Sequence, residues 1–338
     1  MIYIGLKNHI TRGRSIETIY EDICEGCKIE FEDAINIVEK YESDIILEYA
    51  GKICRYYKGN RAEFCSVLNA KSGACPENCK FCAQSAHHKT DIKVYPLISS
   101  DVALEFAKQC EKERIKKFSL VTSGRKLSSD DFKKITKIYK CLVVGTCSHI
   151  CASHGELTYE MALSLKKAGV KTYHHNLETS REYFASICTT HTYDDKVNTI
   201  KNCLKAGLEI CSGGIIGMGE KREDRIKMFF DLRNLGIKSI PINILSPIKG
   251  TSLENIKPLE KEEILKMYGV CRFINPNSII RFAGGRTILD RESQVKLLKG
   301  GVNAAITGNF LTTCGLSVKD DRAIFKEAGL DITGLDIN

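Results

Sequence analysis

The chain has 338 residues, of which 43% are hydrophobic and 27% are charged, as in most folded globular proteins. The formal net charge of +8 is spread along the chain among acidic residues, and without Trp or an aromatic-rich basic patch we expect no nucleic-acid partner. No apolar stretch approaches the roughly 20 residues that span a bilayer, and the first residues lack a secretory-signal pattern, so we expect no membrane segment and a cytoplasmic protein.

Two helical patterns come first, one at 14–24 and one from residue 31 onward, and they predict an N-terminal helical extension over residues 1–60. Beyond residue 60, short apolar runs alternate with amphipathic stretches to the end of the patterned region. The apolar runs predict strands at 64–69, 117–122, 141–145 with an extension to 151, 170–176, 209–214, 239–245, 279–282 and 304–306. Helices are expected between them at 100–114, 129–139, 159–168, 194–206, 222–235, 261–274, 291–299 and 318–328.

The strand-then-helix unit is predicted eight times within residues 61–338. Such repeats imply a parallel sheet, and eight of them match a (β/α)8 TIM-type barrel better than an open doubly wound sheet. No Pro-, Gly- or Ser-rich linker interrupts the region, so residues 61–338 are expected to form one barrel domain. Catalytic groups of such barrels lie at the C-terminal ends of the strands, where functional residues are therefore expected.

Cysteine is unusually frequent, with 16 residues in a chain that shows no export signal, and a reducing compartment favours metal binding or catalysis over disulfides. Cys75, Cys79 and Cys82 form a Cys-x3-Cys-x2-Cys triplet after the first predicted strand. Three thiolates so close together suit an iron–sulfur cluster, and three ligands leave the fourth iron of a cube open. A structural zinc site is the alternative, with His87 or His88 as the fourth ligand.

The triplet, with the aromatic Phe81 before its last Cys, resembles the signature of the radical S-adenosylmethionine superfamily. The resemblance implies that a [4Fe–4S] cluster on the three Cys binds S-adenosylmethionine at its open iron. One electron then releases a 5′-deoxyadenosyl radical from the cofactor, while the barrel orients the reactants and excludes water.

A longer set of segments resembles the biotin synthase family. It runs in order through SGACPENCKFCAQS, YHHNLETS, TTHTY, ICSGGIIGMGE, PINIL, IRFAGGR and FLTT. The resemblance implies an enzyme that inserts sulfur into dethiobiotin to give biotin, with the sulfur supplied by an auxiliary iron–sulfur cluster. It also implies an electron-donor protein such as flavodoxin or ferredoxin, and a homodimer. The implied cofactor contacts are Phe81, Asn176, Glu178, Gly213, Gly214, Ile215 and Ile244, and the implied substrate contacts are Asn176, Asn243, Thr312 and Thr313.

In the family, three Cys on separate strands and an Arg hold the auxiliary cluster. Three of these positions are matched here, but Ser119 occupies the first, and a hydroxyl is a poorer iron ligand than a thiolate. Two further Cys could replace the missing thiolate. Cys147 lies four residues before Cys151 and would share its face on an extended strand, and Cys188 follows the fourth predicted strand. These extra thiols favour a four-iron auxiliary cluster, with [2Fe–2S] as the alternative. The candidate ligands are Cys147, Cys151, Cys188, Cys211 and Arg281.

Other interpretations stay open at this point. A hydrogenase-cofactor maturase or a pyrrolysine-pathway mutase would share the barrel and the radical chemistry, whereas a non-catalytic iron–sulfur carrier would need no site for S-adenosylmethionine. His174 and His191 replace the family's usual Asn and Arg, which indicates a reorganised pocket. The other cysteines are interpreted as packed or exposed thiols without a function: Cys24, Cys27, Cys54, Cys65, Cys110, Cys203, Cys271 and Cys314. A redox or metal-binding role for the Cys24-x2-Cys27 pair is the alternative, although no second such pair accompanies it.

Overall fold

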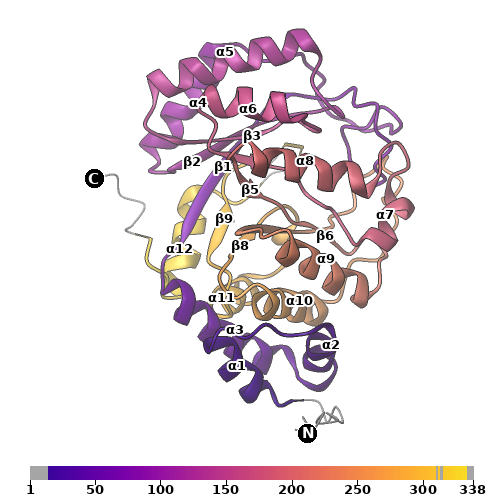
Figure 1. The fold of residues 1–338 in the computed structure, drawn as a ribbon, viewed down its shortest axis with the longest axis vertical. Coiled ribbons are helices and arrows are strands. Elements are labelled where there is room, and N and C mark those ends of the chain that lie inside the picture. The colour runs from indigo at the N-terminus through magenta and orange to yellow at the C-terminus, as the bar shows by residue number, and fades with distance from the viewer. Residues whose placement is uncertain (1–13, 310, 313–314, 333–338) are drawn as a thin grey trace, which may run out of the picture.

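The structure is a computed structural model that describes residues 14–309, 311–312 and 315–332. Its strands are β1 (Glu63–Lys71), β2 (Lys117–Thr122), β3 (His149–Ser153), β4 (Thr172–His174), β5 (Glu209–Cys211), β6 (Gly214–Ile216), β7 (Ser239–Ile244), β8 (Ile279–Phe282) and β9 (Ala304–Ile306). They form one parallel sheet in the order β5-β4-β3-β2-β1-β9-β8-β7-β6, and a pairing of β5 with β7 closes it (Figure 1). Only two residues separate β5 from β6, and together they occupy the position of one barrel strand (a stave). The barrel therefore has eight strand positions, which confirms the (β/α)8 fold class.

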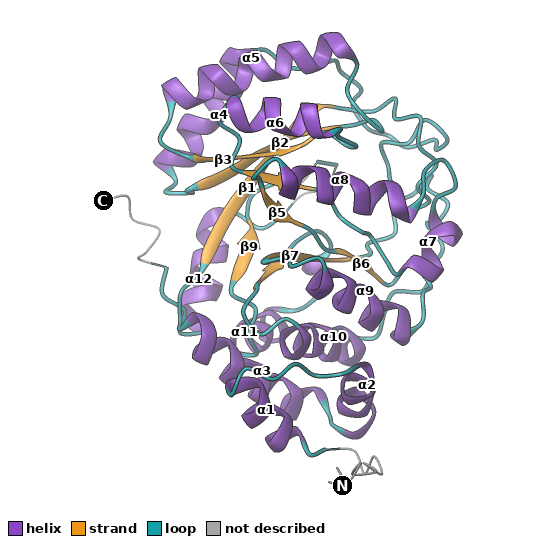
Figure 2. Cartoon of the chain, in the orientation of Figure 1, coloured by secondary structure: helices purple, strands orange, loops and turns teal. Residues whose placement is uncertain are grey.

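Helices surround the barrel (Figure 2). Several begin after a Ser or Thr whose hydroxyl accepts a first-turn N–H, as Ser99, Thr158 and Ser317 do. Within the described residues, no helix combines the length and the apolar character needed to cross a membrane. The helices of the barrel are α4 (Ser100–Lys112), α5 (Ser129–Gly145), α6 (Tyr159–Lys167), α7 (Arg181–Ile187), α8 (Tyr193–Lys205), α9 (Arg222–Asn234), α10 (Lys261–Ile274), α11 (Arg291–Lys299) and α12 (Val318–Glu327), and a short 3-10 helix covers Arg286–Ile288.

The N-terminal segment contains three helices where two were predicted: α1 (Ile16–Cys24), α2 (Phe31–Lys40) and α3 (Ser43–Lys58). Only two residues separate α2 from α3, so the sequence pattern shows no clear break between them. Helix α3 packs against α10 and α11, where a Cβ on Gly51 would lie 2.2 Å from the carbonyl oxygen of Lys299. The absence of a side chain at Gly51 therefore lets this extension lie close to the barrel helices.

The predicted strand at 141–145 is wrong, because these residues are the last turns of α5. The apolar run that suggested a buried strand is mostly exposed: Leu142 is buried, but Val144 has 90% of its full accessibility. Strand β3 begins only at His149, after a short turn. Cys147 therefore lies in the turn before the strand and not on the strand.

Side chains alternate along the strands between the barrel interior and the helices outside. On β1 the aromatic ring of Phe64 is buried against Phe325 of α12, whereas Cys65 faces the interior cavity. On β8 the alternation is the same, since Phe282 packs against Tyr268 of α10 and Arg281 faces the cavity. The interior therefore carries polar and sulfur-containing side chains among apolar ones such as Val67 and Ile279, while the main apolar core lies between sheet and helices.

A buried ion pair joins the loop after β8 to α12. Arg286 and Asp321 are both fully buried and are paired with each other. Removing one partner leaves an uncompensated buried charge, so Asp321→Ala should lower the free energy of unfolding by about 3–5 kcal/mol. The matched control is Asp194→Ala, which breaks an exposed pair with Arg181 and should cost less than about 1 kcal/mol. Urea unfolding followed by circular dichroism measures both, and equal costs would contradict a structural role for the buried pair.

Candidate functional site

The barrel encloses a cavity of about 800 Å³ that opens among the loops after the strands. Six thiols of the described residues line it, in two groups. Cys75, Cys79 and Cys82 belong to the loop after β1, which we call the triplet loop, and they lie at the C-terminal end of the barrel. The second group lies deeper, on the strands themselves, and consists of Cys65 on β1, Cys151 on β3 and Cys211 on β5.

Backbone hydrogen bonds fold the triplet loop back on itself. The N–H of Cys75 donates to the carbonyl of Gln84 at 3.1 Å, and the carbonyl of Cys75 accepts from Ala86 at 2.8 Å. A tight turn brings the N–H of Cys82 to the carbonyl of Cys79 at 3.0 Å. Burial raises the pKa of Cys82 to about 11, so a bound metal would have to displace the proton from this thiol.

The arrangement of the triplet fits a multi-iron cluster better than a single ion. Among the described residues, the one set of three metal-binding side chains whose ligand atoms all lie within 4.8 Å of one another is Cys79, Cys188 and His191, which includes only one thiol of the triplet loop. The rings of His87 and His88 are engaged elsewhere, since they contact backbone carbonyls at 3.0 and 2.9 Å. The geometry therefore does not support a zinc site on the three triplet thiols with His87 or His88 as the fourth ligand.

Cys65 corrects the interpretation of the deeper site. The sequence placed this residue among the thiols without a function, but its Sγ lies 3.4 Å from Nη1 of Arg281 inside the cavity. Cys151 and Cys211 line the same cavity, and among the described residues the three sulfur atoms do not all lie within 4.8 Å of one another, so they are not arranged around a single ion. Three soft ligands and an Arg around one space match the composition expected of an auxiliary cluster site.

Ser119 lies within this ring of side chains without supplying a thiol. It is paired in register with Cys151 on one side and with Val67 on the other, so its side chain faces the cavity. Its hydroxyl is buried and has no hydrogen-bond partner among the described residues. Ser119 therefore faces the same space as Cys151, and the thiol of Cys65 lines that space from the neighbouring strand β1.

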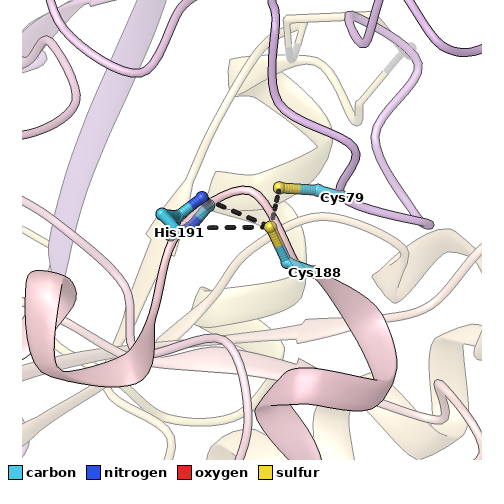
Figure 3. Close-up of side chains that lie close together, drawn as sticks. All are labelled: Cys79, Cys188 and His191. Carbon is cyan, nitrogen blue, oxygen red and sulfur yellow. Dashed lines mark hydrogen bonds between the residues drawn. The ribbon is translucent and has the colours of Figure 1, made fainter.

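Two predicted auxiliary ligands lie elsewhere. Cys147 is exposed in the turn before β3 and does not line the cavity, so its predicted role as a ligand is wrong. Cys188 is the C-cap of α7, and its Sγ lies 3.6 Å from the Sγ of Cys79, next to the triplet loop. It belongs spatially to the first site, not to the auxiliary one (Figure 3).

Charged groups surround the deeper thiols. Arg281 also contacts Glu63, at 3.2 Å between Nη2 and Oε2, and Glu63 accepts a second contact from Lys117 at 2.9 Å. Burial opposes ionisation of Cys211, but hydrogen bonding to His174 and the charge of Arg281 outweigh it and lower the pKa of this thiol to about 7. Cys211 is thus readily deprotonated near neutral pH, as a metal ligand must be.

The residues assigned to the cofactor meet along one edge of the cavity. Asn176 accepts from the N–H of Gly213 at 3.0 Å through Oδ1, and its Nδ2 donates to Glu178 at 3.3 Å. The backbone of Glu178 bridges to Gly214 and receives the N–H of Ile215 at 2.8 Å. Phe81, Asn176, Glu178 and Ile215 line the cavity, as does Lys196, which lies 4.0 Å from Glu178 and was not predicted.

Of the remaining predicted contacts, some line the cavity and others lie outside it. Asn243 lines the cavity and is fixed by the carbonyl of Gly214 and the N–H of Gly284. Ile244 follows it on β7 and does not line the cavity, because successive side chains on a strand point to opposite faces. Thr312 is exposed and outside the cavity lining, although the neighbouring Leu311 belongs to it. Thr313 lies outside the described residues.

Comparison with known proteins identifies the family. A model described as "Radical SAM superfamily" matches residues 70–232, and one described as "Biotin and Thiamin Synthesis associated domain" matches residues 241–331. A biotin synthase from Acetivibrio thermocellus is 52% identical over 91% of this chain and 96% of its own length, and one from Clostridium tetani is 49% identical over 93% and 97%. The chain belongs to the biotin synthase family. Like these biotin synthases, the chain is a radical S-adenosylmethionine enzyme that transfers sulfur.

Solved structures agree on the fold. Methylornithine synthase superposes with a TM-score of 0.80 at 17% identity, covering 93% of this chain and 96% of its own. The FeFe-hydrogenase maturase of Carboxydothermus hydrogenoformans gives 0.79 at 16% identity, covering 93% and 78%. At such low identity these likenesses establish the barrel alone, so the maturase and mutase alternatives gain nothing from them. As a family member the chain uses a [4Fe–4S] cluster and S-adenosylmethionine on a small-molecule substrate.

Proposed function

We propose that this chain inserts sulfur into dethiobiotin to form biotin within the 800 Å³ cavity. The observation that carries the proposal is the presence of two separate thiol groups at two depths of one cavity. Radical generation and sulfur delivery are different tasks and need different metal sites, which must both face the substrate. A substrate lying between the triplet loop and the deeper thiols would contact both.

The triplet loop is proposed to hold the [4Fe–4S] cluster through Cys75, Cys79 and Cys82. When bound, this cluster supplies the electron that cleaves S-adenosylmethionine. Around it the chain supplies orientation: Asn176 and Glu178 present a fixed amide and carboxylate at the cavity edge for the polar groups of the cofactor. Their positions are set by hydrogen bonds to backbone groups of the β5–β6 stave, so they are preorganised.

The deeper thiols are proposed to hold the auxiliary cluster, with Cys65 in place of the missing thiolate at Ser119. The ion pair with Glu63 favours a permanently charged Arg281, and a charged guanidinium is a poor metal ligand. Three thiolates without a fourth strong ligand repeat the donor set of the triplet loop. We therefore propose a four-iron auxiliary cluster. The alternative is a [2Fe–2S] cluster with Arg281 as a ligand, and the iron content of the protein distinguishes the two.

The substrate contact is proposed from the same geometry, whereas the partners are proposed from the family resemblance. Asn243 is proposed to hydrogen-bond the ureido ring of dethiobiotin, because it lies at the C-terminal end of β7 with its amide in the cavity wall. An electron-donor protein such as flavodoxin or ferredoxin is proposed, on the family resemblance, to reduce the first cluster. A homodimer is proposed on the resemblance alone, as is the domain boundary at residue 60.

The test is an anaerobic assay on the full chain, reconstituted with iron and sulfide and supplied with a reductant. Biotin should appear only when dethiobiotin and S-adenosylmethionine are both present, with one cofactor cleaved for each hydrogen removed. Asn243→Ala should raise the KM for dethiobiotin by about tenfold or more, because a hydrogen bond to the ureido ring is lost. If S-adenosylmethionine is cleaved at a rate that dethiobiotin does not affect, and no biotin forms, the proposed substrate is wrong.

A further inference from the structure

The cavity does not end at the deeper thiols. The first residue of five strands lines it as well, at the N-terminal end of the barrel. These residues are Lys117 on β2, Thr172 on β4, Glu209 on β5, Ser239 on β7 and Ile279 on β8. The interior of a (β/α)8 barrel is normally filled by layers of side chains and is not a pore. In this chain the layer below the thiols is mostly polar, and the cavity continues through it.

Beyond this layer the cavity reaches the surface of the protein. Leu204, near the end of α8, and Gly236 and Lys238, in the turn before β7, line it and are exposed. A Cβ on Gly236 would meet no atom within 4 Å apart from its chain neighbours, so this position borders open space. We call this end of the cavity, lined by Leu204, Glu209, Gly236 and Lys238, the basal opening. It lies at the opposite end of the barrel from the triplet loop.

Charged side chains connect the basal opening with the deeper thiols. Nζ of Lys117 is 2.9 Å from Oε2 of Glu63, and the same oxygen is 3.2 Å from Nη2 of Arg281, which faces the thiols. One carboxylate is thus shared by two cations. Together with Lys238, these cations outnumber the carboxylates of Glu63 and Glu209. The excess of positive charge favours the entry of a small anion.

The proposed function creates a demand for sulfur at this depth. Each biotin removes one sulfur atom from the auxiliary site, so a chain that acts more than once must take up sulfur again. The opening beside the triplet loop is the proposed place of S-adenosylmethionine and dethiobiotin, which would fill it during the reaction. Hydrosulfide carries sulfur at the oxidation level of a cluster sulfide, so its uptake releases one proton and needs no electron.

We propose that the basal opening admits hydrosulfide, which replaces the sulfur that the auxiliary site gives to biotin. The inference rests on the proposed function. Lys117 and Lys238 raise the local concentration of the anion at the opening. From there the first residue of β7 leads to a thiol directly, since the hydroxyl of Ser239 is 3.3 Å from the Sγ of Cys211. Sulfur therefore reaches the deeper site without crossing the space proposed for the cofactor and the substrate.

The experiment follows biotin formation by the full reconstituted chain, supplied with reductant, both reactants, ferrous salt and isotopically labelled hydrosulfide. The first biotin of each chain takes unlabelled sulfur already in the protein, and later molecules carry the label. Lys238→Glu should leave the first biotin unchanged but slow the labelled biotin by up to about tenfold at low salt, because a charge that attracts the anion is reversed. Added salt should reduce this difference. Lys238→Arg should match the native chain, as should Lys108→Glu, which reverses an exposed charge of α4 outside the cavity.

A substitution of size tests the path independently of charge. Leu204 is 42% exposed at the basal opening, so a larger side chain there should obstruct the opening without disturbing the core. Leu204→Trp should slow labelled biotin, whereas Leu204→Ala, the matched control, should not. Labelled acid-labile sulfide in the desalted protein gives a second readout that does not depend on product formation. It should accumulate more slowly in Leu204→Trp than in Leu204→Ala.

Three outcomes overturn the inference. Uptake of label at the native rate in both Leu204→Trp and Lys238→Glu would show that sulfur enters elsewhere. Equal slowing of the first and the later biotin would show that these residues affect the reaction and not entry. A native chain that forms the first biotin but takes up no label would show that hydrosulfide is not the species that enters. If the native chain forms no biotin at all, the proposed function fails instead.

Discussion

Replacing any one of Cys75, Cys79 or Cys82 with Ala should abolish formation of 5′-deoxyadenosine from S-adenosylmethionine. Loss of groups that merely support a metal ligand commonly costs 10- to 100-fold in affinity or activity, so loss of the ligand itself should cost more than about a hundredfold. A cube with only two protein thiolates would also lose iron during purification. Product analysis under anaerobic, reducing conditions measures the effect, with iron content determined on the same samples.

The matched control is Cys271→Ala, which removes a fully buried thiol from α10 that lies outside the cavity. This variant should keep both its iron and its cleavage activity, although it will be less stable because a small cavity is left behind. A triplet variant that still forms 5′-deoxyadenosine at the native rate would contradict the assignment of the cluster. An equal loss of activity in the control would mean that the readout reports stability and not ligation.

The fold could be predicted because each stave and each helix carries its own pattern. The bounds of β2, β8, β9, α10 and α11 agree with the prediction residue for residue, since apolar strands there alternate with helices that begin at polar caps. The error at 141–145 came from an apolar run that ends a helix and is exposed. A short apolar run has no periodicity of its own that distinguishes strand from helix, so only the tertiary structure could settle it.

The ligands proposed for the first cluster could be picked out from the sequence because the three Cys are close together in the chain. Those proposed for the auxiliary cluster could not all be picked out, because they come from separate strands and each looks like an isolated thiol. Cys65 carried one usable signal: it alternates with Phe64 on a predicted strand, so it had to face the barrel interior if Phe64 faced the helices. Cys188 was placed at the wrong site because the path of the loop after α7 brings it to the triplet loop, and no local pattern specifies that path.

Cys65→Ala should separate the two chemistries of the enzyme. Cleavage of S-adenosylmethionine should persist, because the triplet loop is intact, whereas biotin formation should fall by more than about a hundredfold because an auxiliary ligand is lost. Cys147→Ala is the matched control, and it should retain both activities because this thiol is exposed and outside the cavity. If Cys147→Ala loses biotin formation and Cys65→Ala retains it, the ligand set proposed from the structure is wrong.

A second substitution sharpens the test of Cys65. Ser119 faces the same space from the adjacent strand, so Ser119→Cys in the Cys65→Ala background should restore a third thiolate and recover part of the auxiliary iron and of biotin formation. Iron analysis with Mössbauer spectroscopy gives the cluster type: about eight irons per chain in the native protein supports two four-iron clusters, and about six supports a [2Fe–2S] auxiliary cluster. Because the ion pair with Glu63 favours a charged Arg281, which is a poor metal ligand, the larger count is expected. A two-iron signal that disappears in Arg281→Ala would instead show that the guanidinium is a ligand.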